Sequence, residues 1–251
     1  MTYSLPAATV FLVLGTALWI GLTYTIFTAL TVKRDKPPFE KSITGAWLIA
    51  AVATQSVAVL ATLIASKWSQ PFRLELNFFA LAMWLWGGML YIWIILLIFY
   101  RYTFFVLSPE DLTPPYWINM GAMAISTLAG ALLVQNAPDA PFLASLLPFL
   151  KGFTVFYWAT GTWWIPMLIV LGAWRHLIRR VPLHYDPLYW GAVFPLGMYT
   201  VATKRMAAAL ELPFLAPLPP AVFAVALAAW ALVCIGLAWE LLHKLVRPTR
   251  H

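Results

Sequence analysis

Long apolar stretches alternate with short polar or proline-rich links along the whole chain of 251 residues. Crossing the hydrocarbon of a bilayer takes roughly 20 apolar residues in an α-helix. Seven stretches reach this length, and the links between them include KRDKPPFEK, SPEDLTPPY and PFLAPLPP. The stretches cover residues 7–31, 45–66, 77–106, 117–134, 149–177, 187–209 and 220–243. We therefore predict an all-α integral membrane protein, with residues 1–251 forming a single transmembrane domain of helical hairpins.

The composition excludes a soluble domain. Hydrophobic residues make up 63% of the chain and charged residues 10%, whereas soluble domains carry roughly 25% charged residues. No segment alternates with period two, so a transmembrane β-barrel is not indicated. The first apolar stretch is followed by its basic cluster and by no small-residue cleavage site, so we expect a retained helix instead of a signal peptide. The single cysteine, Cys234, excludes an intramolecular disulfide.

The basic residues predict the orientation of the helices. The chain carries a net charge of +7, but its Lys and Arg residues lie between apolar stretches, which is typical of a membrane protein and not of one that binds nucleic acid. One predicted side holds Lys33, Arg34, Lys36, Lys41, Arg101, Arg175, Arg179, Arg180, Lys244, Arg247 and Arg250. The other side holds Lys67, Arg73, Lys151, Lys204 and Arg205. Because cytoplasmic loops carry the excess of basic residues, we expect a multi-pass protein of the cell inner (plasma) membrane with its carboxyl terminus cytoplasmic.

The predicted helices fall into two kinds. The stretches 45–66, 117–134 and 187–209 are thin, with many Ala, Gly, Ser and Thr residues, and they alternate with bulky stretches rich in Trp and Phe. Bulky apolar side chains suit a lipid-facing surface, so we expect Trp84 and Trp93 to contact lipid. Small and hydroxyl-bearing residues suit either a lumen or close packing between helices, and for any one residue the two explanations are equally good.

Groups for covalent or redox chemistry are missing at membrane depth. The acidic residues and the four histidines lie in links or at helix ends, so neither an ion-coupled carboxylate nor a bis-His haem site is indicated. No catalytic or nucleotide-binding motif is present. We expect no enzyme, no cofactor and no metal site.

Neutral polar groups remain at membrane depth, and they are the candidates for lining a pore. They are Thr54, Gln55, Ser56, Asn119, Ser126, Thr127, Thr200 and Thr203. Hydroxyl and amide donors without carboxylates suit a small anion. Lys204 and Arg205, at the outer end of the sixth stretch, would add positive potential at a mouth, although by position alone anchoring at the interface is the better explanation.

Pro195 interrupts the sixth stretch, and Phe194 precedes it. A proline inside a transmembrane helix removes one backbone hydrogen bond and bends the chain. A large ring at a bend of a thin helix can block a narrow lumen, so Phe194 with Pro195 is the candidate gate. The alternative is a phenylalanine that packs against a neighbouring helix or lipid.

Several segments resemble a known family. They are PLYWGAVFPLGMYTVATKR, WATGTWWIPMLIVLGAWRHLIRRVPLHYDP, PPYWINMGAMAISTLAG and TALTVKRDKPPFEKSITGAWLIAAVATQSVAVL. They are similar to the tellurite-resistance and C4-dicarboxylate transporter family, which includes the plant guard-cell slow anion channel. The resemblance implies a ten-helix fold of five hairpins with quasi-fivefold symmetry, in which the odd-numbered helices line a pore. It also implies that Phe194 matches the phenylalanine of the ninth helix that gates the pore.

On this alignment the three thin stretches correspond to the fifth, seventh and ninth family helices, and the chain begins at the fourth. Either the chain is truncated, or an upstream start was missed, or another subunit completes the pore. The resemblance implies a channel or facilitator in the lipid bilayer for small anions such as C4-dicarboxylates, tellurite, sulfite or chloride. It is compatible with a homo-oligomer as well as with a single chain. The alternatives are a non-transporting scaffold or subunit, an inactive truncated family member, and, disfavoured, an intramembrane enzyme.

Overall fold

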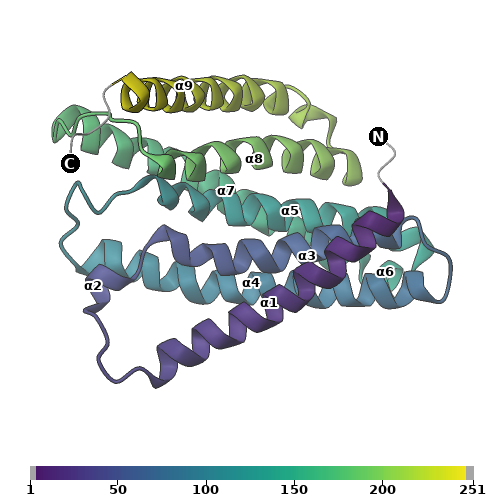
Figure 1. Cartoon of the computed structure of the whole chain (residues 1–251). Helices are drawn as coiled ribbons and strands as arrows, with labels where there is room; N and C mark the ends of the chain where they lie inside the picture. Colours follow the sequence, from purple (N-terminus) through teal and green to yellow (C-terminus); the bar gives the residue numbers. More distant parts are fainter. Residues whose placement is uncertain (1–3, 247–251) are drawn as a thin grey trace.

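The computed structural model describes residues 4–246, and the side chains of residues 4–243. Within these residues the regular structure is helical, without strands. The long helices run side by side (Figure 1): α1 (Leu5–Val32), α3 (Ile49–Ala65), α4 (Phe72–Phe104), α5 (Ile118–Asn136), α7 (Leu147–Ala173), α8 (Trp190–Ala209) and α9 (Leu218–Val246). Two short helices, α2 (Phe39–Ser42) and α6 (Pro141–Ser145), lie in the links.

The three thin helices begin in the same way. A 3₁₀ turn leads directly into each of them: Gly45–Leu48 before α3, Pro114–Trp117 before α5 and Pro187–Tyr189 before α8. These turns pack against one another, the second contacting both the first and the third. Further 3₁₀ turns cover Ala137–Asp139 and Pro213–Leu215, and α7 continues into a π-helical turn over Trp174–Ile178. The shared entry brings one end of α3, α5 and α8 together.

Helix α5 is the centre of the bundle. It packs against α3, α4, α7 and α8, while α1 packs on α3 and α9 packs on α8. In its most apolar window 94% of the residues are buried, against 6% for α1 and 11% for α9. Small residues allow this, because they let four neighbours approach one helix closely.

Between residues 4 and 246, six helices are long and apolar enough to span a membrane, which confirms the helical membrane fold. They include α1, α4, α7 and α9, and α3 and α5 together with their entry turns. Helix α8 is outside this set; its 20 residues include Lys204 and Arg205. It nevertheless runs alongside α5 and α9, and α1 begins at the opposite end of the bundle from the end of α9 (Figure 1). The sequence predicted seven spanning helices, and α8 is the one that length and apolarity do not identify within the described residues.

The prediction that Trp84 and Trp93 of α4 both contact lipid is wrong for Trp84. Trp93 is 59% exposed, but Trp84 is fully buried. The Trp84 indole Nε1 donates to the carbonyl oxygen of Ser126 at 2.8 Å, and its ring meets three rings of α7 edge to face: Phe149, Phe153 and Tyr157. A tryptophan can satisfy its N–H inside the bundle, so side-chain bulk alone does not identify the lipid-facing side.

A buried arginine fastens the entry turns to α4. Arg101 is 3% exposed, and its guanidinium donates to the carbonyl of Ile43 at 2.9 Å and to the hydroxyl of Tyr116. It also pairs with Asp111 at 3.3 Å. Since Ile43 precedes α3 and Tyr116 precedes α5, one side chain joins the ends of three helices. The guanidinium suits this task because its several N–H groups point in fixed directions.

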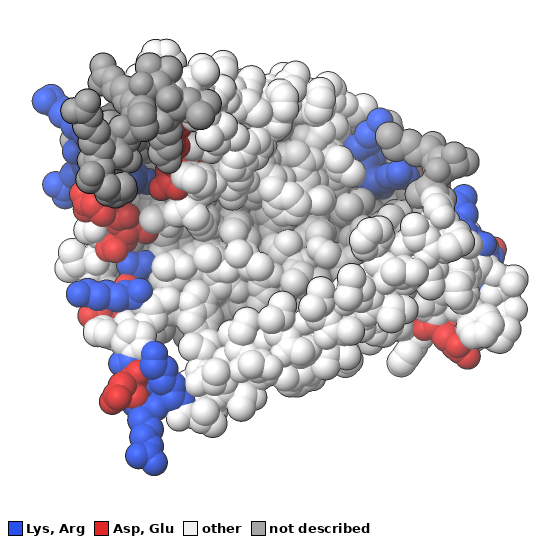
Figure 2. Space-filling model, viewed as in Figure 1, with Lys and Arg blue, Asp and Glu red and all other residues white. Residues whose placement is uncertain are grey.

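The charged side chains are confined to the two ends of the bundle. Figure 2 shows Lys, Arg, Asp and Glu gathered at both ends of the visible face, with a band free of charge between them. This band is hollowed between α1 and α9 (Figures 1 and 2). An uncharged band between two charged rims is what a bilayer requires of a spanning protein.

Candidate functional site

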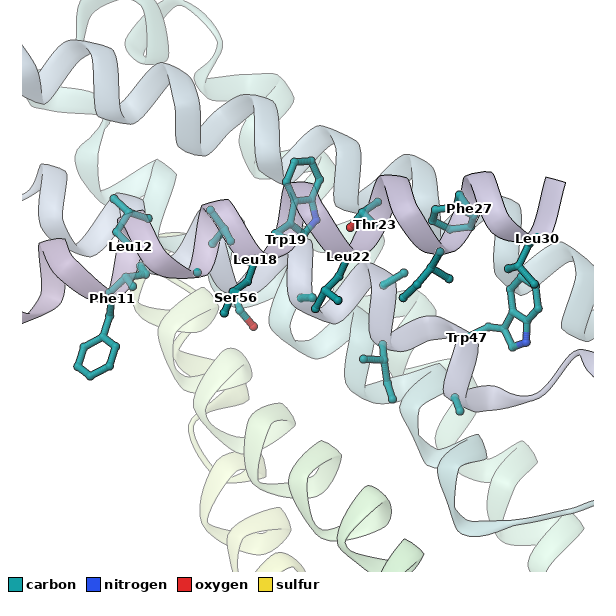
Figure 3. A pocket seen from close by; sticks show the side chains of 18 of the residues that line it. Phe11, Leu12, Leu18, Trp19, Leu22, Thr23, Phe27, Leu30, Trp47 and Ser56 are labelled. Atoms are coloured by element: carbon teal, nitrogen blue, oxygen red, sulfur yellow. The ribbon is translucent and has the colours of Figure 1, made fainter. Parts of the chain in front are cut away.

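Two grooves open on the surface of the thin helices. One lies between α1 and α3 and has a volume of about 760 Å³; its lining includes Trp19, Leu22, Trp47 and Ser56 (Figure 3). The other lies between α8 and α9, measures about 1350 Å³, and includes Lys204 and Arg205 in its lining. A candidate residue can contact a ligand only if it lines one of these grooves.

On α3, the three candidates have different surroundings. Thr54 is fully buried and accepts a hydrogen bond from the Trp19 indole at 2.7 Å. Gln55 is fully buried and donates to the carbonyl of Trp84 at 2.9 Å. It fits only because Gly87 has no side chain, since a Cβ there would lie 2.5 Å from the Gln55 amide nitrogen. Thr54 and Gln55 thus lie in helix contacts.

Ser56 is the exposed candidate of α3. It lines the groove between α1 and α3 (Figure 3), and its hydroxyl donates to the carbonyl of Val52 at 2.9 Å. The hydroxyl oxygen remains free to accept, and its proton can turn towards a ligand. Ile49 and Ala53 are exposed on the same helix face. Ser56 is therefore the one polar side chain among the α3 residues that line this groove.

The candidates on α5 do not face the hollowed surface. Asn119, Ser126 and Thr127 are all fully buried. Trp84 and Tyr91 of α4 donate to the carbonyls of Ser126 and Asn119, at 2.8 and 3.1 Å, so this side of α5 faces α4.

The hydroxyls of Ser126 and Thr127 donate back to carbonyls one turn earlier, at 2.8 Å each. The fully buried amide of Asn119 lies close to the hydroxyl of Tyr102 on α4, with which it can share a hydrogen bond.

The part of α5 that stays slightly accessible is apolar. Ile118, Ile125, Leu128 and Leu132 are 7%, 4%, 8% and 6% exposed. With about 100° of rotation per residue, these four share one stripe that is turned away from Ser126 and Thr127. Gly121, which contacts Pro195 of α8, lies on the same stripe, so this side of α5 is buried and faces α8.

On α8, Pro195 is buried and the neighbouring Phe194 is exposed. Pro195 is buried against Gly121 of α5, where a Cβ would come within 2.7 Å of the proline ring. Phe194 is 43% exposed, and Val201 and Arg205, seven and eleven residues later, continue its face of the helix. The proline thus packs α8 on α5, and the phenylalanine side chain stays partly exposed outside that contact.

The remaining α8 candidates divide in the same way. Thr203 is fully buried and accepts a hydrogen bond from the Trp158 indole at 3.0 Å. Thr200 is half-buried and lines the groove between α8 and α9 together with Lys204 and Arg205, both exposed. The structure therefore brings Thr200 and the two cations to one groove and places Thr203 in a helix contact.

Glu211 is a member of this groove that the sequence did not single out. It lines the groove between α8 and α9, and its backbone is left-handed, with a φ of 58°. The turn around it closes α8, because the amide of Leu212 donates to the carbonyl of Ala207 at 2.9 Å. Glycine usually occupies such a position, so a glutamate there does not indicate the turn.

No metal centre is formed by the side chains of residues 4–243, since no three His, Cys, Asp or Glu side chains come together. The chemistry offered by the two grooves consists of hydroxyl groups, apolar side chains, two cations and one carboxylate. These groups can bind and guide a ligand.

Comparison with known proteins identifies related chains. A family profile described as SLAC1, voltage-dependent anion channel, matches residues 1–238. An uncharacterized membrane protein of Mycobacterium tuberculosis (strain H37Rv) is 40% identical over 161 residues, which are 64% of this chain and 81% of the relative. An uncharacterized transporter of Methanocaldococcus jannaschii is 28% identical over 128 residues, 51% of this chain and 35% of the relative. No solved structure matches the chain significantly.

Proposed function

The chain belongs to the voltage-dependent anion channel family, and on that premise we propose that it is a channel or facilitator that moves small anions along the hollowed face of α3, α5 and α8. It is a multi-pass membrane protein of a family whose members transport anions, and its relatives in Methanocaldococcus jannaschii are named as transporters. The substrate class proposed is a small anion of the chloride, sulfite, tellurite or C4-dicarboxylate type.

The observation that carries the proposal is the position of Phe194. Its side chain is 43% exposed on α8, next to a proline that is buried against Gly121 of the central helix. Pro195 removes the hydrogen bond that an amide would donate to the carbonyl of Gly191, so the helix can bend there. We propose that the ring obstructs the path and that bending of α8 moves it aside.

The surface along the path also supports an anion as the substrate. Ser56 and Thr200 supply hydroxyl donors in the two grooves, and Lys204 with Arg205 supplies positive potential at one end. The apolar residues Ile49 and Ala53 of α3, exposed beside Ser56, would form a stretch with few hydrogen-bond partners, where water and ions pass only when the path widens. The fully buried candidates Thr54, Gln55, Asn119, Ser126, Thr127 and Thr203 would then stabilise the helix contacts.

We further propose that the carboxyl terminus faces the cytoplasm and that the protein lies in the plasma membrane. The basic links Lys33 to Lys41 and Arg175 to Arg180 lie on the side where α1 ends, and cytoplasmic loops carry such an excess. A reporter fused after His251 should be active in the cytoplasm, and activity only outside would reverse the orientation.

The test is anion flux in liposomes that contain the purified chain. Phe194→Ala should increase the flux of chloride or of a larger anion, because the ring that obstructs the path is removed. Phe78→Ala is the matched control, since Phe78 of α4 is 64% exposed. It should leave flux unchanged.

Two outcomes would contradict the gate. A folded Phe194→Ala protein with unchanged flux would show that the ring does not limit transport. If Phe194 mainly packs against a neighbouring helix, truncation should instead cost about 3–5 kcal/mol of stability and reduce the yield of folded protein. Thermal unfolding measured on the same samples separates these cases. A folded wild-type chain without flux of any of the four anions would favour the non-transporting scaffold.

A further inference from the structure

The groove between α8 and α9 combines charge with an apolar wall. Lys204 and Arg205 approach it from α8, and Val201 and Ala208 of the same helix lie beside them. Its other wall is the start of α9, with Phe223 55% exposed. Since α8 ends at Ala209 and α9 begins at Leu218, the groove opens at the level where a spanning hairpin leaves the hydrocarbon.

Lys204 and Arg205 form no ion pair or side-chain hydrogen bond within the part of the chain that the structure describes. Among residues 4–243, the ion pairs are Arg73 with Asp139 and Arg101 with Asp111, and neither includes Lys204 or Arg205. Both side chains are exposed. They also precede the last turn of α8, which contains no basic residue, so neutralising the carboxyl end of the helix dipole does not account for them.

The groove carries a net positive charge. Glu211 is its one carboxylate, against the two cations, and no hydrogen bond or ion pair joins it to either of them in the described part of the chain. The start of α9 contributes few backbone donors, because Pro219 and Pro220 lack an N–H. A ligand that complements the groove therefore needs one negative charge, held by the two side chains.

We propose that this groove binds an anionic phospholipid, with its phosphodiester between Lys204 and Arg205 and an acyl chain along the apolar wall formed by Val201 and Phe223. Lysine and arginine reach lipid phosphates while their methylene stems remain in the apolar region. A single negative charge would balance the groove. A free anion would leave its apolar wall uncovered, and a zwitterionic lipid would bring an extra ammonium to a site that is already positive.

This proposal does not depend on anion transport, because binding is measured without flux. Lipid binding would nevertheless affect the mouth of the proposed anion path, because Lys204 and Arg205 also lie there. A bound phosphodiester would cancel the positive potential of Lys204 and Arg205, so the lipid and a transported anion would compete for the same charges.

The experiment measures binding to the full chain in detergent. Phosphatidylglycerol, phosphatidylethanolamine, phosphatidylcholine and inorganic phosphate are titrated separately, followed by native mass spectrometry and by the midpoint of thermal unfolding. Phosphatidylglycerol should form a stoichiometric adduct and raise the midpoint more than the other three. A ligand that binds the folded state raises the midpoint with its concentration, which gives the affinity.

The double variant Lys204→Gln/Arg205→Gln should bind phosphatidylglycerol about 25-fold more weakly, since each cation near an anionic headgroup is worth about a factor of five. Lys33→Gln/Arg34→Gln is the matched control, because it removes two exposed cations after α1 and should bind as the wild type does. Glu211→Gln should bind more tightly.

Equal loss in both double variants would show that only general surface charge matters, which overturns the site. Equal stabilisation by phosphatidylcholine or phosphatidylethanolamine would overturn the choice of an anionic lipid. Equal stabilisation by inorganic phosphate would show a free-anion site in place of a lipid site. If Lys204→Gln/Arg205→Gln fails to fold, the single variants Lys204→Gln and Arg205→Gln each test the same loss at about five-fold.

Discussion

Helices α5 and α1 are both long and apolar enough to cross a membrane, yet α5 is buried inside the bundle and α1 is exposed at its edge. In the apolar window of α5 94% of the residues are buried, whereas in that of α1 the share is 6%. The central helix is the less apolar of the two and contains Asn119, Ser126 and Thr127. The peripheral helix has Leu12 as its buried residue and exposes Phe11, Leu14 and Leu18.

This difference shows that apolarity and burial report different things in a membrane. Lipid is as apolar as leucine, so a leucine-rich helix gains little by moving from lipid into the bundle. Small residues gain close packing there, and polar ones gain hydrogen-bond partners. A thin helix with serine and threonine is therefore drawn to the centre, as α5 is, while α1 remains at the lipid boundary.

The largest effect that tests this comparison is expected at Trp84, which packs on the central helix. Trp84→Ala removes a fully buried indole and its hydrogen bond to the carbonyl of Ser126, and should lower the free energy of unfolding by about 3–5 kcal/mol. Trp93→Ala, on the same helix but 59% exposed, should change it little. Reversible unfolding in mixed micelles measures both. Equal losses would mean that burial in the bundle adds nothing beyond contact with lipid.

A smaller effect is expected from a single methyl group on a glycine. Gly121→Ala places a Cβ 2.7 Å from the ring of Pro195 and should cost about 1–3 kcal/mol, because α8 must move away from α5. Gly15→Ala on α1 is the matched control, since nothing lies within 4 Å of the added carbon. It should be neutral or slightly stabilising. A neutral Gly121→Ala would show that α8 adjusts without loss and that Pro195 does not fix it on α5.

The smallest effect concerns the attachment of α1 itself. Trp19→Phe removes the hydrogen bond from the indole to Thr54 at 2.7 Å and should cost about 0.6 kcal/mol, the usual size of such a bond between transmembrane helices. The ring should still stack on Trp86, 5.9 Å away between centroids. A loss above that of Gly121→Ala would mean that α1 is held as firmly as the central helices.

Much of the fold could be predicted because length and apolarity suffice to identify a spanning helix. The ranges 45–66 and 187–209 agree with α3 including its entry turn and with α8 to within a few residues. The thin and bulky classes also separated the central helices from their neighbours, with α5 as the clearest case. Periodicity could not say which side of α5 faces the hollowed surface, because both sides are apolar or weakly polar. Asn119 and Ser126 consequently looked like lining residues, although their helix side faces α4.

The sequence by itself determined that this chain is a bundle of membrane-spanning helices, that α5 contains the small residues of a central helix, and that charges are confined to the two ends. These properties follow from transfer between water and hydrocarbon, which depends on each residue separately. Only the tertiary structure decided which polar groups reach a groove. It buried Thr54 and Gln55 in helix contacts, left Ser56, Thr200 and Phe194 accessible, and brought Glu211 beside Lys204 and Arg205. The physical reason is that a hydroxyl or an amide at membrane depth is satisfied equally well by a neighbouring carbonyl or by a ligand, and the rotation of each helix selects between them.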